Sequence, residues 1–227
     1  MLMKQIVITG HNGFLGSNLL SKLISEKYKI TGISKTIKKN NLIKQIKRNI
    51  LNIKDSDIAK NSCIIHLAAI TNVAYCEKYP EECYRVNVMA TQKILEIARK
   101  KNCSLIYPST SHVYTIPHKL PIKETHPTNA TSVYSESKIS AEKLCQAYSK
   151  SYGLNIIRTC AFNHEGPRRN KVFGIPWYAY QIAKIEKGLQ EPVIKVGHLG
   201  DKRNFTHVKD MVRAYSLAVN QCESGEL

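Results

Sequence analysis

The segment Ile6–Gly16, IVITGHNGFLG, constrains the fold more than any other part of the chain. An apolar run is followed by Gly10, Gly13 and Gly16 at regular spacing, and an amphipathic stretch comes next. Gly10 permits a tight turn. Gly13 has no side chain, so a bound group can come close to its backbone, and Gly16 lets a helix pack closely on a strand. The segment therefore predicts a buried first strand, a turn and a helix that begins near Phe14.

This turn also indicates a ligand. Unpaired N–H groups at a helix N-terminus attract phosphate oxygens, and the glycine spacing after a strand is typical of a dinucleotide-binding turn. We therefore expect the pyrophosphate of a cofactor to contact Gly10, Asn12, Gly13, Phe14, Leu15 and Gly16.

The end of the second apolar run indicates which cofactor binds. An acidic residue usually meets a free ribose 2′-hydroxyl at this position, but the chain reads Gly32-Ile33-Ser34-Lys35. A hydroxyl and a cation suit a 2′-phosphate, so Ser34 and Lys35 favour NADP over NAD. The alternative is that Lys35 belongs only to a lysine-rich surface.

Short apolar runs alternate with helical patterns along the chain, which is typical of βαβ units and a parallel sheet. Strands are expected at Gln5–Thr9, Ile30–Ser34, Cys63–Leu67, Ser104–Pro108 and Asn155–Thr159, with a weaker one at Lys47–Leu51. Helices are expected at Phe14–Lys27, Pro80–Lys101, Ser132–Tyr152, Phe173–Lys187 and Val208–Asn220. The fold class is α/β, a Rossmann-type doubly wound parallel sheet followed by a partial, mixed C-terminal substrate-binding region.

Charge and composition narrow the function classes. The net charge is +17, and Ser21–Lys54 holds ten Lys or Arg residues against one acid, Glu26. This basic stretch contains a single aromatic residue, Tyr28, so a solvated lysine surface is favoured over nucleic-acid binding. There is no apolar run of about 18 residues, so no membrane span is expected. Nor does the N-terminus resemble a signal peptide.

The cysteines indicate a compartment. All seven are scattered, and none forms a CxxC pair. Reduced thiols filling small gaps in the core are favoured over a metal site or a disulfide framework. We therefore expect no metal site and a cytoplasmic location.

Two later segments carry the expected chemistry. Tyr134 and Lys138 are four residues apart at the start of a predicted helix, so they share one helical face. The ammonium should lower the pKa of Tyr134 and make it an acid/base for hydroxyl–carbonyl interconversion, while also binding ribose hydroxyls. Thr110 follows the strand that begins at Ser104, and strand ends face the cofactor in such sheets. Thr110 or a neighbouring serine should therefore donate a hydrogen bond to the substrate oxygen.

Taken together, the glycine turn, His66-Leu-Ala-Ala69, Asn87, Ser109-Thr110, Tyr134 and Lys138 resemble the extended short-chain dehydrogenase/reductase family. The resemblance covers essentially the whole chain. It implies that Thr110, Tyr134 and Lys138 are catalytic, and that Leu67, Ala68 and Ala69 contact the cofactor.

Two further motifs are similar to GDP-mannose 4,6-dehydratases and to GDP-4-keto-6-deoxyhexose reductases and epimerases. They are Phe162–Arg169, FNHEGPRR, and Gly200–Asp210, GDKRNFTHVKD. By this resemblance Asn163 and Arg203 bind the substrate diphosphate, and Arg168 or Arg169 lies near phosphates. Amide donors and guanidinium forks are what a buried diphosphate needs.

The chain departs from the dehydratase pattern in one catalytic position. Those enzymes carry a glutamate two residues after the catalytic Thr, where this chain has His112. A histidine can act as a base near neutral pH, but the change favours 4-keto reduction or epimerisation of a GDP-linked hexose over 4,6-dehydration. A non-catalytic dinucleotide- or RNA-binding protein is the remaining alternative, and the Thr110, Tyr134 and Lys138 set argues against it.

The resemblance also implies an organisation. Residues 1–162 form the NADP-binding domain with its catalytic residues, and residues 163–227 form part of a substrate-binding region that we expect to be incomplete. The expected helices Pro80–Lys101 and Ser132–Tyr152 resemble the pair that builds a dimer interface in this family. A homodimer or homotetramer is therefore expected, with a nucleotide sugar as the small-molecule partner.

Overall fold

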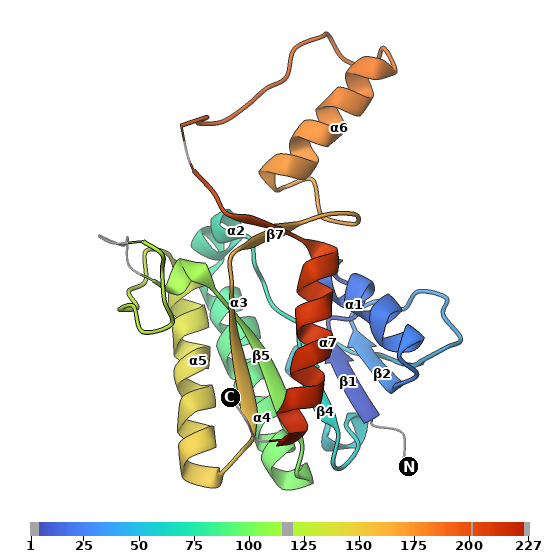
Figure 1. Ribbon diagram of the computed structural model, residues 1–227, viewed down its shortest axis with the longest axis vertical. Coiled ribbons are helices and arrows are strands. Elements are labelled where there is room, and N and C mark those ends of the chain that lie inside the picture. The colour runs from blue at the N-terminus through green and yellow to red at the C-terminus, as the bar shows by residue number, and fades with distance from the viewer. Residues whose placement is uncertain (1–4, 115–119, 201, 225–227) are drawn as a thin grey trace.

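The computed structural model describes residues 5–114, 120–200 and 202–224. A six-stranded sheet lies between two layers of helices (Figure 1), and neighbouring strands are parallel throughout, in the order β3-β2-β1-β4-β5-β6. The strands are β1 (Gln5–Thr9), β2 (Lys29–Ser34), β3 (Lys44–Lys47), β4 (Cys63–His66), β5 (Ser104–Thr110) and β6 (Ile156–Ala161). This α/β architecture is the predicted Rossmann-type fold.

The helices divide between the two faces of the sheet. In Figure 1, α1 and α7 lie on one side, and α3, α4 and α5 lie on the other. Their bounds, with the short α2, are α1 (Phe14–Ser25), α2 (Val73–Lys78), α3 (Pro80–Tyr84), α4 (Ala90–Lys101), α5 (Val133–Tyr152) and α7 (Val208–Ser224).

The core follows from the alternation of side chains along each strand. Val7 and Ile64 pack with α4 and α5, while Ile6, Ile8 and Ile65 pack with α1 and α7. Because both faces are covered, the central strands are apolar without interruption, as parallel sheets require. These residues are completely buried.

Helix α7 contributes to this core although it comes late in the chain. Val208, Val212 and Val219 are buried against the sheet layer, and the Tyr215 hydroxyl lies 2.8 Å from Thr159 Oγ1 of β6. Part of the segment after residue 162 therefore completes the sheet domain. The division at residue 163 remains a prediction.

The rest of the C-terminal segment extends beyond the sheet. Strands β7 (Asn163–Glu165) and β8 (Phe205–His207) form a separate parallel pair. Helix α6 (Gly174–Glu186), orange in Figure 1, projects away from the sheet beyond the carboxyl ends of the strands. Within the described residues, no helix is long and apolar enough to cross a bilayer.

Three local predictions were wrong or incomplete. The weak strand at Lys47–Leu51 lies earlier, at β3, and Ile50–Asn52 is instead a 3-10 turn capped by the Asn49 side chain, which accepts from Leu51 N. Helix α2 was not predicted. The single helix expected at Pro80–Lys101 contains a π-helical turn at Arg85–Met89, between α3 and α4.

The cysteines also differ from expectation. Cys76 of α2 and Cys83 of α3 are joined in a disulfide, so the prediction of reduced thiols throughout is wrong for this pair. The free thiols among the described side chains are those of Cys63, Cys103, Cys145 and Cys160.

Candidate active site

A cavity of about 1010 Å³ lies where the carboxyl ends of β1, β4, β5 and β6 meet β7 and α6. The chain passes from β1 to β2 on one side and continues at β4 on the other, so the cavity opens at the point where the strand order reverses. Ligands of open α/β sheets bind at such points. Predicted site residues that line it are Gly10, Gly13, Phe14, Leu15, Gly16, Leu67, Ala69, Thr110, His112, Tyr134, Lys138, Asn163, Arg169 and Arg203.

The glycine turn has the geometry that its sequence predicts. Gly10 has a φ of 71°, and its N–H donates to the Ile33 carbonyl at 2.7 Å. A Cβ atom at Gly10 would lie 2.9 Å from Ala68 N, and one at Gly16 would lie 2.5 Å from the Gly10 oxygen. The turn therefore cannot carry side chains at these positions, and its backbone stays open for a dinucleotide pyrophosphate.

The remaining predicted cofactor residues lie beside the cavity rather than on its wall. Asn12 N donates to Ser34 Oγ at 3.3 Å, which joins the glycine turn to the end of β2. Lys35 follows and is exposed. Ala68 N donates to Thr9 Oγ1 at 3.2 Å and so fixes the loop after β4.

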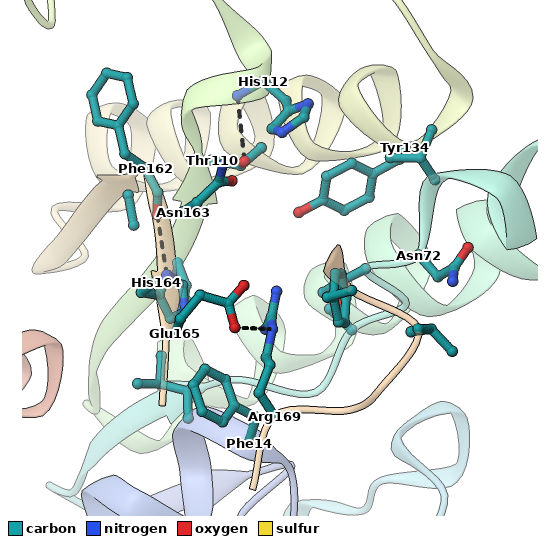
Figure 2. A pocket seen from close by; sticks show the side chains of 18 of the residues that line it. Phe14, Asn72, Thr110, His112, Tyr134, Phe162, Asn163, His164, Glu165 and Arg169 are labelled. Atoms are coloured by element: carbon teal, nitrogen blue, oxygen red, sulfur yellow. Dashed lines mark hydrogen bonds and ion pairs between the residues drawn. The ribbon is translucent and has the colours of Figure 1, made fainter. Parts of the chain in front are cut away.

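Thr110, Tyr134 and Lys138 come together as predicted. Thr110 ends β5, while Tyr134 and Lys138 occupy successive turns of α5, whose start is capped by Ser132. All three catalytic candidates are buried, and Thr110 lies close enough to Tyr134 to act toward lowering the pKa of its hydroxyl. Figure 2 shows Tyr134 and Thr110 facing the same open space.

The electrostatics of this group differ from the prediction. Burial raises the pKa of Tyr134, and the opposing contributions come from Thr110 and Arg169. Lys138 Nζ lies 4.3 Å from the centre of the Tyr107 ring, and burial lowers the pKa of Lys138 to about 8. The prediction that Lys138 lowers the pKa of Tyr134 is wrong for this arrangement.

His112 lies beside the catalytic group in a 3-10 turn, Ser111–Val113. Its N–H donates to Thr110 Oγ1 at 3.3 Å, and its ring meets the Tyr134 ring edge-on with centroids 6.3 Å apart. Burial lowers the pKa of His112, and Arg203 acts in the same direction. At neutral pH the imidazole is thus mainly unprotonated and able to accept a proton.

The structure separates the two adjacent arginines. Arg168 has a φ of 76°, and its Nη1 donates to the Ser17 carbonyl of α1 at 2.8 Å. Arg169 instead lines the cavity, with its guanidinium 3.7 Å from the centre of the Phe173 ring and 4.9 Å from that of Phe14. Arg169 is therefore the one of the pair that is placed to meet a ligand in the cavity.

Sequence reasoning assigned no role to Glu165, which also lines the cavity. Its Oε2 lies 3.8 Å from Arg169 Nε, and burial raises its pKa while Arg169 opposes that rise. The spacing contained a signal for this residue, since Asn163 and Glu165 are alternate positions of one strand and so face the same side. Among the described residues, no cluster of three or more His, Cys, Asp or Glu side chains could hold a metal ion.

The family model that matches this chain, over residues 6–227, is that of the NAD-dependent epimerase/dehydratase family. GDP-6-deoxy-D-mannose reductase of Pseudomonas aeruginosa is 32% identical over 71% of this chain and 55% of its own length. GDP-mannose 4,6-dehydratase of Vibrio cholerae is 28% identical over 96% of this chain and 65% of its own length. The chain thus spans roughly half to two thirds of these relatives.

Among solved structures, UDP-glucuronic acid 4-epimerase from Bacillus cereus is similar in fold. Its structure in complex with UDP-glucuronic acid and NAD is 26% identical to this chain in sequence, with a TM-score of 0.83. The match covers 95% of this chain and 73% of that one.

Proposed function

Because the chain belongs to the NAD-dependent epimerase/dehydratase family, within the extended short-chain dehydrogenases/reductases, we propose that it modifies a nucleotide-linked hexose by hydride transfer at C4. This proposal rests on Thr110, Tyr134 and Lys138, which line the same cavity as the glycine turn. A protein that only binds a dinucleotide or RNA does not need a buried tyrosine hydroxyl and a threonine next to the cofactor-binding turn. RNA binding through the basic surface therefore has less support.

The residues have distinct tasks in this reaction. Bound nicotinamide supplies the hydride acceptor or donor. Tyr134 takes the proton of the C4 hydroxyl, or returns it, and Thr110 donates a hydrogen bond to the same oxygen. Lys138, on the next turn of α5, holds a positive charge near the ribose. Arg169, Arg203 and Asn163 supply donors for the diphosphate.

For the cofactor we propose NADP in preference to NAD. The support is the cationic and hydroxyl-bearing end of β2, where Ser34 and Lys35 stand in place of an acidic ribose ligand. The similar epimerase structure contains NAD, so the two cofactors must be compared directly on this protein.

For the substrate we propose a GDP-linked hexose, processed by 4-keto reduction or epimerisation. Two GDP-sugar enzymes are among the relatives, and His112 stands where the dehydratases carry glutamate. The second candidate is GDP-mannose 4,6-dehydration, which the placement of His112 beside Tyr134 favours, since its neutral imidazole can take the C5 proton.

Two incubations separate these outcomes. The protein is mixed with NADP and either GDP-mannose or UDP-glucose, and separately with NADPH and a GDP-linked 4-keto-6-deoxyhexose. The products are separated by chromatography and identified by mass spectrometry and NMR, and oxidation of NADPH with the ketone supports 4-keto reduction. A product of unchanged mass but altered C4 configuration supports epimerisation, and a loss of water from GDP-mannose supports dehydration. His112→Ala then spares C4 chemistry if the histidine only lines the cavity, and stalls the reaction after oxidation if it is the base. If the protein converts none of these nucleotide sugars, the proposed function is contradicted.

Two further expectations remain to be tested. A homodimer or homotetramer would be detected by light scattering. A cytoplasmic location would be detected by cell fractionation.

A further inference from the structure

Glu165 is held in an unusual position for a carboxylate. Its Oε2 atom is buried and, among the described residues, accepts no hydrogen bond. The adjacent Arg169 Nε is also buried without a hydrogen-bond acceptor, because the two atoms are 3.8 Å apart. Most buried polar atoms in proteins have a hydrogen-bond partner, and a buried pair without one is often part of a catalytic site.

The separation within this pair has a visible cause. The guanidinium of Arg169 is stacked 3.7 Å from the centre of the Phe173 ring and faces Phe14 on another side. These rings hold Arg169 in place, so it does not close onto Glu165. Figure 2 shows the Glu165 carboxylate and the Tyr134 hydroxyl pointing into the same part of the cavity, with the Arg169 guanidinium beside them.

Charged and titratable groups surround Glu165. Burial raises its pKa, and Arg169 opposes that rise. The charged and titratable groups around it are Arg169, His164 on the same strand, His207 paired on β8, and His112, Tyr134, His198 and Arg203 on the cavity wall. Glu165 is the carboxylate among the described residues that line this cavity.

We propose that Glu165 is a second proton-transfer residue of this cavity, acting on the carbon next to the C4 carbonyl of a 4-keto hexose. This rests on the proposed function, which places such a ketone beside Tyr134. The carboxylate takes the proton of the C–H bond, and that electron pair forms a carbon–carbon double bond. The electron pair of the C4=O4 double bond moves to O4, and Tyr134 protonates that oxygen. Reversal returns a proton to the carbon, so no oxidant is consumed.

The test follows this carbon directly. A GDP-linked 4-keto-6-deoxyhexose is incubated with the protein and NADP in D₂O, and mass spectrometry measures deuterium gained at carbon. In parallel, NADPH absorbance measures hydride transfer to the same ketone. The variants are Glu165→Gln, Glu165→Asp and the control Glu191→Gln, which removes an exposed carboxylate outside the cavity.

We expect exchange in the wild type, and a loss on the order of 10²-fold or more in Glu165→Gln. Hydride transfer should fall far less, Glu165→Asp should retain part of the exchange, and Glu191→Gln should match the wild type in both. Cofactor-induced thermal shifts confirm that each variant is folded.

Other results overturn the proposal. Wild-type hydride transfer without exchange removes the role of Glu165 and leaves the proposed function intact. Exchange without hydride transfer contradicts the proposed function alone. Equal losses of exchange and hydride transfer in Glu165→Gln would show that Glu165 only positions Arg169.

Discussion

Lys138 Nζ lies 4.3 Å from the centre of the Tyr107 ring, one helical turn after Tyr134. The aromatic face attracts the ammonium, but the site is fully buried, and burial lowers the pKa of Lys138 to about 8. The charge is therefore present below this pH and is lost as the pH rises through it.

The first prediction is a pH dependence. The kcat/KM for the C4 reaction should hold below about pH 8 and fall above it, because the Lys138 ammonium, which we propose binds the ribose, loses its proton. The profile is measured by NADPH absorbance between about pH 6.5 and 9.5, a range that brackets this titration. Lys143→Ala, at an exposed position on the same helix, should leave the profile unchanged. A flat profile through this range would contradict the placement of Lys138.

Tyr134→Phe should nearly abolish turnover. The substitution removes one oxygen from a buried ring, so the loss should be on the order of 10²- to 10⁴-fold in kcat, as for other acid–base residues. Cofactor affinity, measured by calorimetry, should stay within a few fold. Full activity of this variant on any identified substrate would show that another group moves the proton.

Lys35→Asp should narrow or reverse the preference for NADP. A charge-assisted contact with a 2′-phosphate contributes about 1.5–3 kcal/mol, or roughly 10- to 100-fold in Kd, and exposure of Lys35 puts the effect at the lower end. Fluorescence titration with NADPH and NADH gives both constants. Lys60→Asp changes the same charge at a distant exposed position and should not alter the ratio. Equal wild-type affinities would refute the choice of NADP.

Asn87→Ala should destabilise the fold. Asn87 is buried, its Oδ1 accepts from Ile70 N at 2.8 Å, and its Nδ2 donates to Ile70 O and Ser137 Oγ, each at 2.9 Å. Losing these bonds leaves buried polar groups without a partner, and each such group lowers the free energy of unfolding by about 1–3 kcal/mol. The melting temperature should fall by at least about 4 °C. Gln92→Ala, at an exposed position of α4, serves as the control and should change it little.

The sheet domain was predictable because its signals are local. The apolar strands, the glycine turn and the helical spacing of Ala90–Ala98 each depend on neighbouring residues, and β1, α1 and α5 begin within a residue or two of the expected positions. Strand β3 was misplaced because an edge strand buries little and its sequence, KQIK, carries no apolar alternation of useful length.

The site was predictable in membership more than in electrostatics. Spacing brought Thr110, Tyr134 and Lys138 together, but it could not reveal that Tyr107 would take the ammonium of Lys138. That contact depends on a side chain from β5 turning toward α5. The choice between Arg168 and Arg169 likewise required the backbone turn at Arg168. The disulfide between Cys76 and Cys83 depends on the position of α2, which had no clear helical pattern.

The π-helical turn Arg85–Met89 has a consequence for how this segment can evolve. Each residue of a regular helix turns the chain by about 100°, so one added residue rotates everything before it by that amount relative to everything after it. Within one continuous helical segment, Cys83 can then face α5 while Ile94 and Leu95 face the sheet. Removing a single residue here would shorten the chain very little, yet it would put one of the two faces out of phase with its partner.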